Sequence, residues 1–175
     1  MRTLNAGCWL DTEGTDFIDL TVPPRMDDVE VCNMNKDRIP YPDNTFDRII
    51  CKQVIEYIYN PMNMLNEFHR VLKNGGVLDL TSPNESFHVL FSRRYTKAFL
   101  NKWNMDDNQF AILYNELNLV GLLNKAGFKD IQWKFGFDGY TTTKLIIYKS
   151  AFKAAGILSK RLFSPQIIIK AVKGD

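Results

Sequence analysis

Four residues of the chain stand where predicted strands end: Gly7, Asp19, Asn33 and Gln53. In an open parallel sheet, ligands bind beyond the carboxyl ends of the strands, at the point where the strand order reverses. A glycine there lets a ligand approach the backbone closely, and the carboxylate of Asp19 can accept hydrogen bonds from the two hydroxyls of a ribose. Asn33 can hydrogen-bond the edge of a base. The set suits a ligand that contains adenosine, and the spacing alone does not say which one.

His88 is the histidine that falls at the same predicted edge, just beyond the strand Val77–Thr81. Its ordinary pKa lies near neutrality, so it is a candidate general base for deprotonating a hydroxyl. A surface histidine with no catalytic role is the plainer alternative. Glu56 and His69 are expected on helix faces, solvated or structurally paired. The cysteines lack metal-ligand spacing, and no metal site is predicted.

The elements that must position these residues are organised around residues 46–84. Phe46–Cys51 is a short apolar run with two β-branched residues, and a turn cluster precedes it. A helix is expected to begin at Asn60-Pro61 and to end in a left-handed cap at Asn74-Gly75-Gly76. Val77–Thr81 is then a second buried strand. Two apolar strands joined through a helix predict a right-handed βαβ crossover in a parallel sheet.

The rest of the chain adds strands and helices around that unit, and no linker or repeat divides it. Further strands are expected at Arg2–Asn5, Asp16–Leu20, Val29–Cys32, Ile131–Phe137 and Gln166–Val172. Helices are expected within residues 87–108, 110–126 and 144–163. About seven strands that alternate with helices indicate one α/β layered domain.

Bulk properties agree with an ordinary globular chain. Its 175 residues suffice for one substantial core, and a net charge of +2 gives no argument for nucleic acid, so none is expected as a partner. The three cysteines lie in or beside predicted strands, which favours buried free thiols in a reducing compartment. The N-terminal stretch has no apolar run typical of a signal peptide, so a cytoplasmic protein is the default expectation.

Several motifs occur together in one order. A first strand enters a glycine turn, an acidic residue ends the second strand, and PYPDNTFD leads into the fourth strand. The segment VIEYI follows, and FHRVLKNGG precedes the fifth strand. With these motifs the chain resembles class I S-adenosylmethionine-dependent methyltransferases, in particular the short bacterial type that acts on small molecules and glycans. The resemblance covers roughly half of the chain, and residues 40–76 are its most specific part.

The resemblance implies a Rossmann-like, mostly parallel seven-stranded sheet with flanking helices and an antiparallel last strand. It implies one methyltransferase domain over residues 1–175, with 87–110 and 139–164 as cap or lid insertions. The cofactor would be S-adenosylmethionine, with S-adenosylhomocysteine as product, and the acceptor a small molecule, a sugar or a lipid-linked compound. Cofactor contacts would come from Gly7, Cys8, Asp19, Leu20, Asn33, Met34, Lys52 and Gln53.

The sequence also departs from that family. Gly7 is followed by Cys8-Trp9 in place of a glycine-rich loop, residues 9–15 are too few for a helix, and Asn33 replaces an acidic residue. A non-catalytic binding or regulatory protein with the same fold is therefore the alternative function. A nicotinamide-dependent dehydrogenase is disfavoured because no G-x-G-x-x-G follows the first strand.

Residues 144–163 form a basic amphipathic pattern without acidic residues. Packing on the sheet is one interpretation. The other is a lid over the acceptor site with weak contact to an anionic membrane surface.

Overall fold

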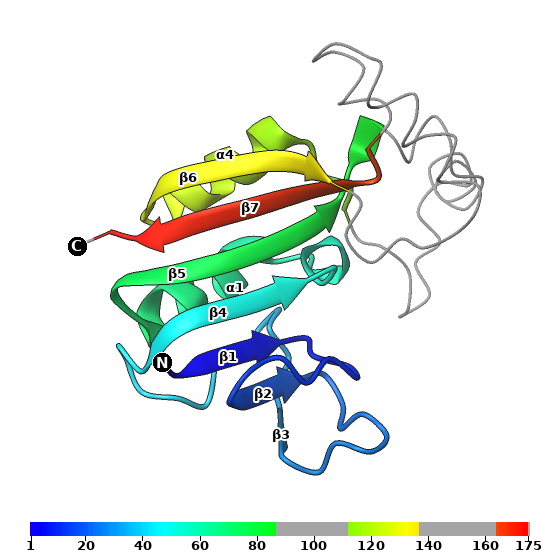
Figure 1. Ribbon diagram of the computed structural model, residues 1–175, viewed down its shortest axis with the longest axis vertical. Coiled ribbons are helices and arrows are strands. Elements are labelled where there is room, and N and C mark those ends of the chain that lie inside the picture. The colour runs from blue at the N-terminus through cyan, green and yellow to red at the C-terminus, as the bar shows by residue number, and fades with distance from the viewer. Residues whose placement is uncertain (87–111, 137–163, 175) are drawn as a thin grey trace.

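The structure, a computed structural model, describes residues 1–86, 112–136 and 164–174 (Figure 1). Its centre is a seven-stranded sheet in the order β3-β2-β1-β4-β5-β7-β6. The strands are β1 (Thr3–Ala6), β2 (Asp16–Asp19), β3 (Val29–Val31), β4 (Phe46–Lys52), β5 (Leu72–Pro83), β6 (Phe128–Gly136) and β7 (Gln166–Lys173). The predicted strands are therefore confirmed, with ends that shift by a few residues.

The direction of the strands also agrees with the expectation. The pairs among β3, β2, β1, β4 and β5 are parallel, whereas β7 runs antiparallel between β5 and β6. The chain first builds outward from β1 to β3 and then returns to place β4 on the other side of β1. The strand order thus reverses between β1 and β4, which is where doubly wound sheets bind ligands.

The helix that connects β4 to β5 begins as its sequence indicates. Helix α1 (Pro61–Val71) has Asn60 as N-cap, whose side chain accepts a hydrogen bond from the amide of Asn63. Its predicted glycine cap is wrong: α1 ends at Val71, and Leu72 is already extended as the first residue of β5. The glycines lie inside β5 where the pairing with β4 is irregular, and Gly75 has a left-handed φ of +75°, so the glycine turn forms within the strand and not at the end of α1.

The segment between β4 and α1 is a single turn of 3-10 helix, η1 (Ile55–Tyr57). The second long helix is α4 (Glu116–Lys125), which follows residues 112–115 and leads into β6. Within the described stretches, no helix is long and apolar enough to span a membrane.

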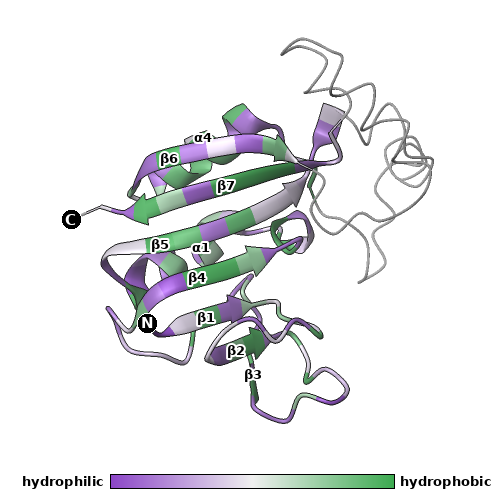
Figure 2. Cartoon of the chain, viewed as in Figure 1, coloured by the Kyte–Doolittle hydropathy of each residue, from purple (hydrophilic) through white to green (hydrophobic). Residues whose placement is uncertain are grey.

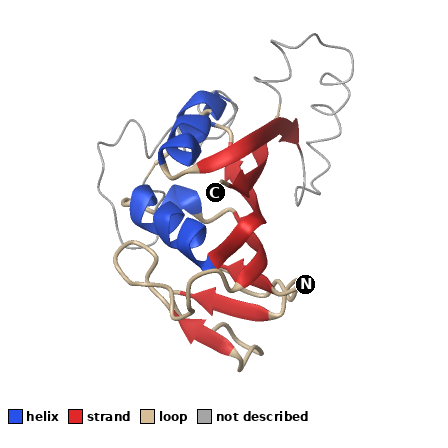
Figure 3. Ribbon diagram, turned by 90° about the vertical axis from the view of Figure 1, so that its left-hand side faces the viewer, coloured by secondary structure: helices blue, strands red, loops and turns tan. Residues whose placement is uncertain are grey.

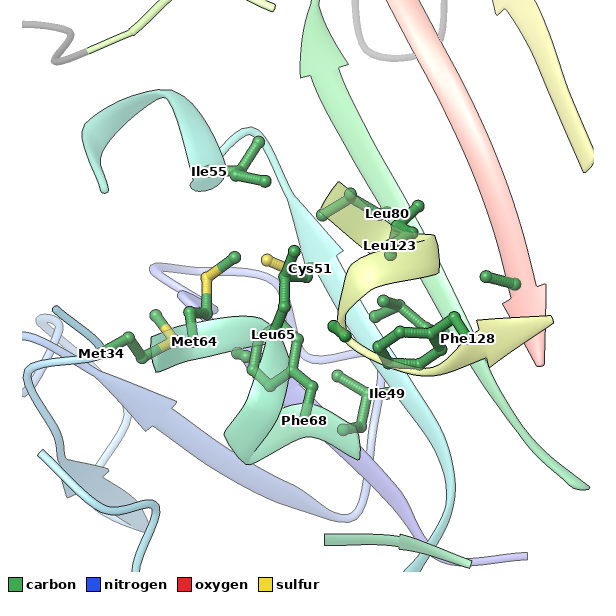
Figure 4. Packing of buried hydrophobic residues seen from close by; sticks show 14 of the residues in the cluster. Met34, Ile49, Cys51, Ile55, Met64, Leu65, Phe68, Leu80, Leu123 and Phe128 are labelled. Carbon is green, nitrogen blue, oxygen red and sulfur yellow. The ribbon is translucent and has the colours of Figure 1, made fainter. Parts of the chain in front are cut away.

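The described helices lie on one face of the sheet (Figure 3). Side chains from β4 and β5 meet those from η1, α1 and α4 there and form the core (Figure 4). The fully buried members include Ile49, Cys51, Ile55, Leu65, Phe68, Leu80, Leu123 and Phe128. This apolar burial is the main source of stability of the unit.

The other face of β5, β7 and β6 carries no helix among the described residues (Figure 3). Buried and more exposed residues alternate along β5 and β7, and hydrophobic and hydrophilic bands alternate along β5 (Figure 2). Alternation of this kind is typical of a sheet with one face in the core and one face in solvent.

Candidate functional site

The carboxyl ends of β1, β2 and β3 are held together by backbone hydrogen bonds. The amide of Gly7 donates to the carbonyl of Ile18 at 2.8 Å, and the amide of Cys32 donates to the carbonyl of Asp19 at 2.8 Å. Gly7, Asp19 and the start of the loop at Asn33 therefore share one edge of the sheet, as predicted from their places after the strands.

Gly7 has a backbone conformation that requires glycine. Its φ is +73°, and a Cβ atom there would lie 2.3 Å from Cγ2 of Val54. A side chain would thus be strained and would also push away the segment that follows β4. The glycine lets the turn after β1 lie directly against the turn after β4, which closes the edge at the switch point.

The carboxylate of Asp19 is fixed by two backbone amides. Oδ2 accepts a hydrogen bond from the amide of Trp9 at 2.8 Å, and Oδ1 accepts one from the amide of Leu20 at 2.7 Å. Each carboxylate oxygen has further acceptor capacity after one hydrogen bond. The group is therefore held in place and can still receive two donors from a ligand.

Trp9 belongs to this site although its position was not predicted. Its φ of +45° lies in the left-handed region, which is uncommon for a tryptophan. That conformation directs its amide to Asp19. The side chains of Trp9 and Leu20 are each 58% exposed. An unusual backbone and exposed apolar side chains beside a fixed carboxylate are features that sequence patterns do not report.

Asn33 and Met34 follow β3 at the same edge. Oδ1 of Asn33 accepts a hydrogen bond from the backbone amide of Asn35 at 3.1 Å. The backbone amide of Asn33 donates to Oδ2 of Asp37 at 2.9 Å. These bonds fix the loop. The side chain of Met34 is buried in the core, and its carbonyl accepts from Nδ2 of Asn63 at 3.1 Å. A contact of Met34 with a ligand at this edge would involve its backbone.

Gln53 stands at the end of β4 in a strained conformation. Its φ is +56°, and its amide donates to the carbonyl of Thr81 at 3.1 Å. Nε2 also donates to Oγ1 of Thr81 at 3.2 Å. Non-glycine residues with positive φ cost free energy and cluster at functional sites. Gln53 is thus held at the crevice by two bonds to β5.

Lys52 is engaged with the loop between β1 and β2. Its Nζ lies 2.9 Å from Oδ2 of Asp11 and 2.7 Å from Oε2 of Glu13. Burial lowers the pKa of Lys52, but the hydrogen bonds that its ammonium group donates to the two carboxylates outweigh burial and raise it. Arg48 adds ion pairs to Glu13 and Asp79. The loop takes the place of a helix, and its ion pairs with Lys52 and Arg48 attach it to β4.

The cysteines are buried and free, as predicted. Burial, and to a lesser extent Asp19, raises the pKa of the Cys8 thiol to about 11. Burial likewise raises the pKa of Cys32 to about 11. Thiols of this kind are poor nucleophiles because the thiolate is the reactive form. A ligand would meet the backbone of Cys8 and not its sulfur.

Glu56 does not lie on a solvated helix face, which corrects part of the expectation. Only 1% of the residue is exposed, and no hydrogen-bond partner for its Oε2 is found in the described part of the chain. Burial raises its pKa to about 8. Glu56 packs near Cys51 and Tyr114, since its charge acts on both. The prediction of a helix face was wrong because η1 is only one turn of 3-10 helix.

His88 lies outside the described residues, and its role as general base stays a prediction. The same holds for the basic segment 144–163 and for nearly all of the cap or lid insertions at 87–110 and 139–164.

Comparison with known proteins agrees with the fold. A family model described as "Methyltransferase domain" matches residues 19–80. A 2-methyl-6-phytyl-1,4-hydroquinone methyltransferase of rice is 31% identical over 106 residues, which are 61% of this chain and 28% of the relative. A ubiquinone/menaquinone biosynthesis C-methyltransferase of Desulfotalea psychrophila is 31% identical over 121 residues, which cover 61% of this chain and 48% of the relative. The matches thus span less than half the length of these relatives.

Solved structures show the fold over nearly the whole chain. An S-adenosylmethionine-dependent methyltransferase of Thermotoga maritima has a TM-score of 0.66 at 17% identity, covering 98% of this chain and 81% of that chain. A phosphoethanolamine N-methyltransferase of Haemonchus contortus, solved with S-adenosyl-L-methionine, has a TM-score of 0.66 at 14% identity and covers 100% of this chain and 49% of that chain. The chain is therefore similar in sequence to methyltransferases over part of its length, and nearly its whole length has the fold of S-adenosylmethionine-dependent methyltransferases.

Proposed function

We propose that the chain is an S-adenosylmethionine-dependent methyltransferase that acts on a small-molecule acceptor. The observation that carries the proposal is the carboxylate of Asp19, fixed by two amides at the switch point of the sheet beside Gly7. The relatives are named as methyltransferases of hydroquinone and quinone biosynthesis, which favours an enzyme over a non-catalytic binding protein.

The residues at this edge fit an adenosine-containing cofactor. Asp19 retains acceptor capacity for two ribose hydroxyls, and Trp9 and Leu20 present exposed apolar surface beside it for an adenine ring. Gly7, Asn33 and the backbone of Cys8 and Met34 would complete the pocket. Gln53 and Lys52 would border the end that lies nearest to β4.

When bound, S-adenosylmethionine supplies a methyl group that its sulfonium already activates. The contribution of the chain is then proximity and alignment. Two bonds to Thr81 hold Gln53, and ion pairs hold the loop after β1, so the walls of the crevice are ordered before an acceptor enters. A small-molecule, sugar or lipid-linked acceptor would meet the methyl group at the carboxyl ends of β4 and β5.

Calorimetry with S-adenosylhomocysteine tests the proposal directly. We expect one molecule to bind per chain. An absence of binding at millimolar ligand, with the chain shown to be folded by circular dichroism, would favour the non-catalytic alternative.

A further inference from the structure

Two cross-strand rows of side chains lie on the face of the sheet that carries no helix among the described residues. Directly paired residues of neighbouring strands point to the same face. Strand register therefore places the first row as Lys52, Thr81, Ile168 and Lys134, and the second as Ile50, Asp79, Lys170 and Gln132. The rows cross β4, β5, β7 and β6 in that order.

All members of these rows except Ile50 line a hollow of about 350 Å³. Its wall residues include Lys52, Asp79, Thr81, Gln132, Lys134, Ile168 and Lys170. The volume is in the range of small-molecule sites. A hydroxyl, an amide and ammonium groups around an isoleucine provide donors for an anion together with an apolar surface for the rest of a ligand.

The charges of the hollow are unevenly compensated. Lys52 pairs with Asp11 and Glu13, and Asp79 pairs with Arg48. For Lys134 and Lys170 the described residues provide no ion pair. They are diagonal neighbours on adjacent strands, so their Cβ atoms lie about 7–8 Å apart and both long side chains can reach one anionic group. The open cationic positions therefore lie together at the β6–β7 side of the hollow.

The hollow adjoins the proposed methyl-donor crevice. Thr81 and Lys52 belong to its wall, and Thr81 accepts the hydrogen bond from Gln53 at the end of β4. Lys134 is three strands away from Lys52 in the same row, which corresponds to about 14 Å across the sheet. A ligand that reaches from the crevice to Lys134 would be the size of a sugar or similar group joined to a diphosphate.

We propose that the hollow binds a phosphate or diphosphate group of the methyl acceptor, with Lys134 and Lys170 as the cationic contacts. The inference rests on the proposed function, since it places the acceptor between this hollow and the crevice. A soluble phosphate-bearing metabolite and the head group of a phospholipid share this chemistry, and the experiment separates them.

The first measurement is calorimetric binding of inorganic pyrophosphate to the full chain. We expect the double variant Lys134→Gln/Lys170→Gln to bind at least about tenfold more weakly than the unmodified protein. The matched control is Lys125→Gln/Lys129→Gln, which removes two exposed lysines of α4 and β6 outside the hollow. We expect the control to change affinity less than about twofold. Absence of pyrophosphate binding, or equal loss in both double variants, would overturn the proposal.

The second measurement identifies the source of the phosphate. Uridine diphosphate glucose should compete with pyrophosphate if the ligand is soluble. Vesicles of phosphatidylcholine with phosphatidylglycerol should bind the protein, and the Lys134/Lys170 variant should bind them less, if the ligand is a lipid head group. If the variant changes the binding of neither probe, the hollow does not hold the phosphate of either kind of acceptor, and its assignment to the methyl acceptor is overturned.

Affinity for S-adenosylhomocysteine separates this inference from the proposed function. The Lys134/Lys170 variant should keep that affinity, which also shows that it is folded. Loss of pyrophosphate binding with intact S-adenosylhomocysteine binding supports the hollow. A wild-type chain that binds pyrophosphate and not S-adenosylhomocysteine overturns the proposed function and leaves an anion site.

Discussion

Asp19 shows how a single side chain can be prepared for a ligand by the backbone around it. Its carboxylate joins the turn after β1 to the turn after β2 through the amides of Trp9 and Leu20. A carboxylate that is already oriented loses less conformational entropy when a ligand binds. This is a physical reason for an acidic residue at the end of β2, apart from its fit to a ribose.

Replacing Asp19 with alanine should weaken S-adenosylhomocysteine binding by about 1.5–3 kcal/mol, the range for a hydrogen bond to a charged group. Calorimetry measures the change. Asp27→Ala is the matched control, because Asp27 is an exposed carboxylate in the loop that follows β2. Equal affinities in the Asp19 and Asp27 variants would remove Asp19 from the site.

Glu56 gives the chain a carboxyl group that stays protonated near neutral pH. Burial raises its pKa from an ordinary 4.5 to about 8. The folded state therefore keeps the proton up to about pH 8, whereas the unfolded state releases it near pH 4.5. The stability that this proton confers is complete below pH 4.5, the pKa of the unfolded state, and is lost as the pH rises to about 8, the pKa of the folded state.

The variant Glu56→Gln should remove that pH dependence. The unfolding free energy of the variant minus that of wild type should increase by roughly 2–5 kcal/mol from acid to alkaline pH. One pKa unit corresponds to about 1.4 kcal/mol. Urea unfolding of both proteins at about pH 5 and about pH 9 measures the difference, and other groups cancel in the comparison. A difference that is the same at both pH values would contradict the assignment of Glu56 as a buried acid.

At the scale of elements, Arg70 attaches α1 to the segment before β4. Its guanidinium donates to the carbonyls of Ile39 and Tyr41 at 2.9 Å each, and it pairs with Glu67 and Asp43. The two carbonyls belong to the turn that leads into β4, so one side chain closes hydrogen bonds that the loop could not make by itself. The hydrogen bonds that Arg70 donates to Glu67 are the main cause that raises the pKa of Arg70 above its ordinary value.

The variant Arg70→Met should cost roughly 2–4 kcal/mol of unfolding free energy, because it leaves Glu67 and two carbonyls without their donor. Arg38→Met is the control: Arg38 also pairs with Asp43, but its side chain is 73% exposed, and an exposed pair contributes at most about 1 kcal/mol. Chemical denaturation of both variants compares them. Similar losses would show that the loop does not depend on Arg70.

For the whole molecule, the dominant feature is a largely parallel sheet with helices on one face in its described part (Figure 3). Such sheets usually have both faces covered, and their strands then consist of continuous apolar runs. Here β5 contains Asp79 between two leucines, and β7 contains Lys170 two positions after Ile168. The strands thus carry polar residues on the second face, and the hollow proposed to bind phosphate is lined by these polar residues.

Ile168 and Ile169 provide a test of this asymmetry, because they are neighbours on β7 that point to opposite faces. Ile169 is 1% exposed and belongs to the core cluster, whereas Ile168 does not belong to it, although both residues contribute to the wall of the hollow. We expect Ile169→Ala to destabilise the protein by about 2–4 kcal/mol and Ile168→Ala by less than about 1.5 kcal/mol. Thermal or urea unfolding measures both. Equal losses would mean that the second face is covered as well as the first.

The sequence by itself determined the strands, the α/β class and the edge at which the site lies. Short β-branched runs between turn residues predict strands wherever the run is long enough to be buried, and residues after parallel strands must meet at one edge. For this reason the sequence predicts that Gly7, Asp19 and Gln53 lie at one edge, and the family resemblance implies the antiparallel last strand.

Only the tertiary structure decided the features that depend on contacts between distant segments. Pairing of Leu72 with Phe46 of β4 begins β5 before the glycines, which lie in an irregular stretch of the β4–β5 pairing. Burial among Cys51 and Tyr114 makes Glu56 a buried acid, and ion pairs with Asp11 and Glu13 engage Lys52. The two rows of the hollow exist because register aligns Lys134 and Lys170 across strands separated by about 30 residues or more in the chain. Local propensity carries no information on such pairings, because they form only when the sheet assembles.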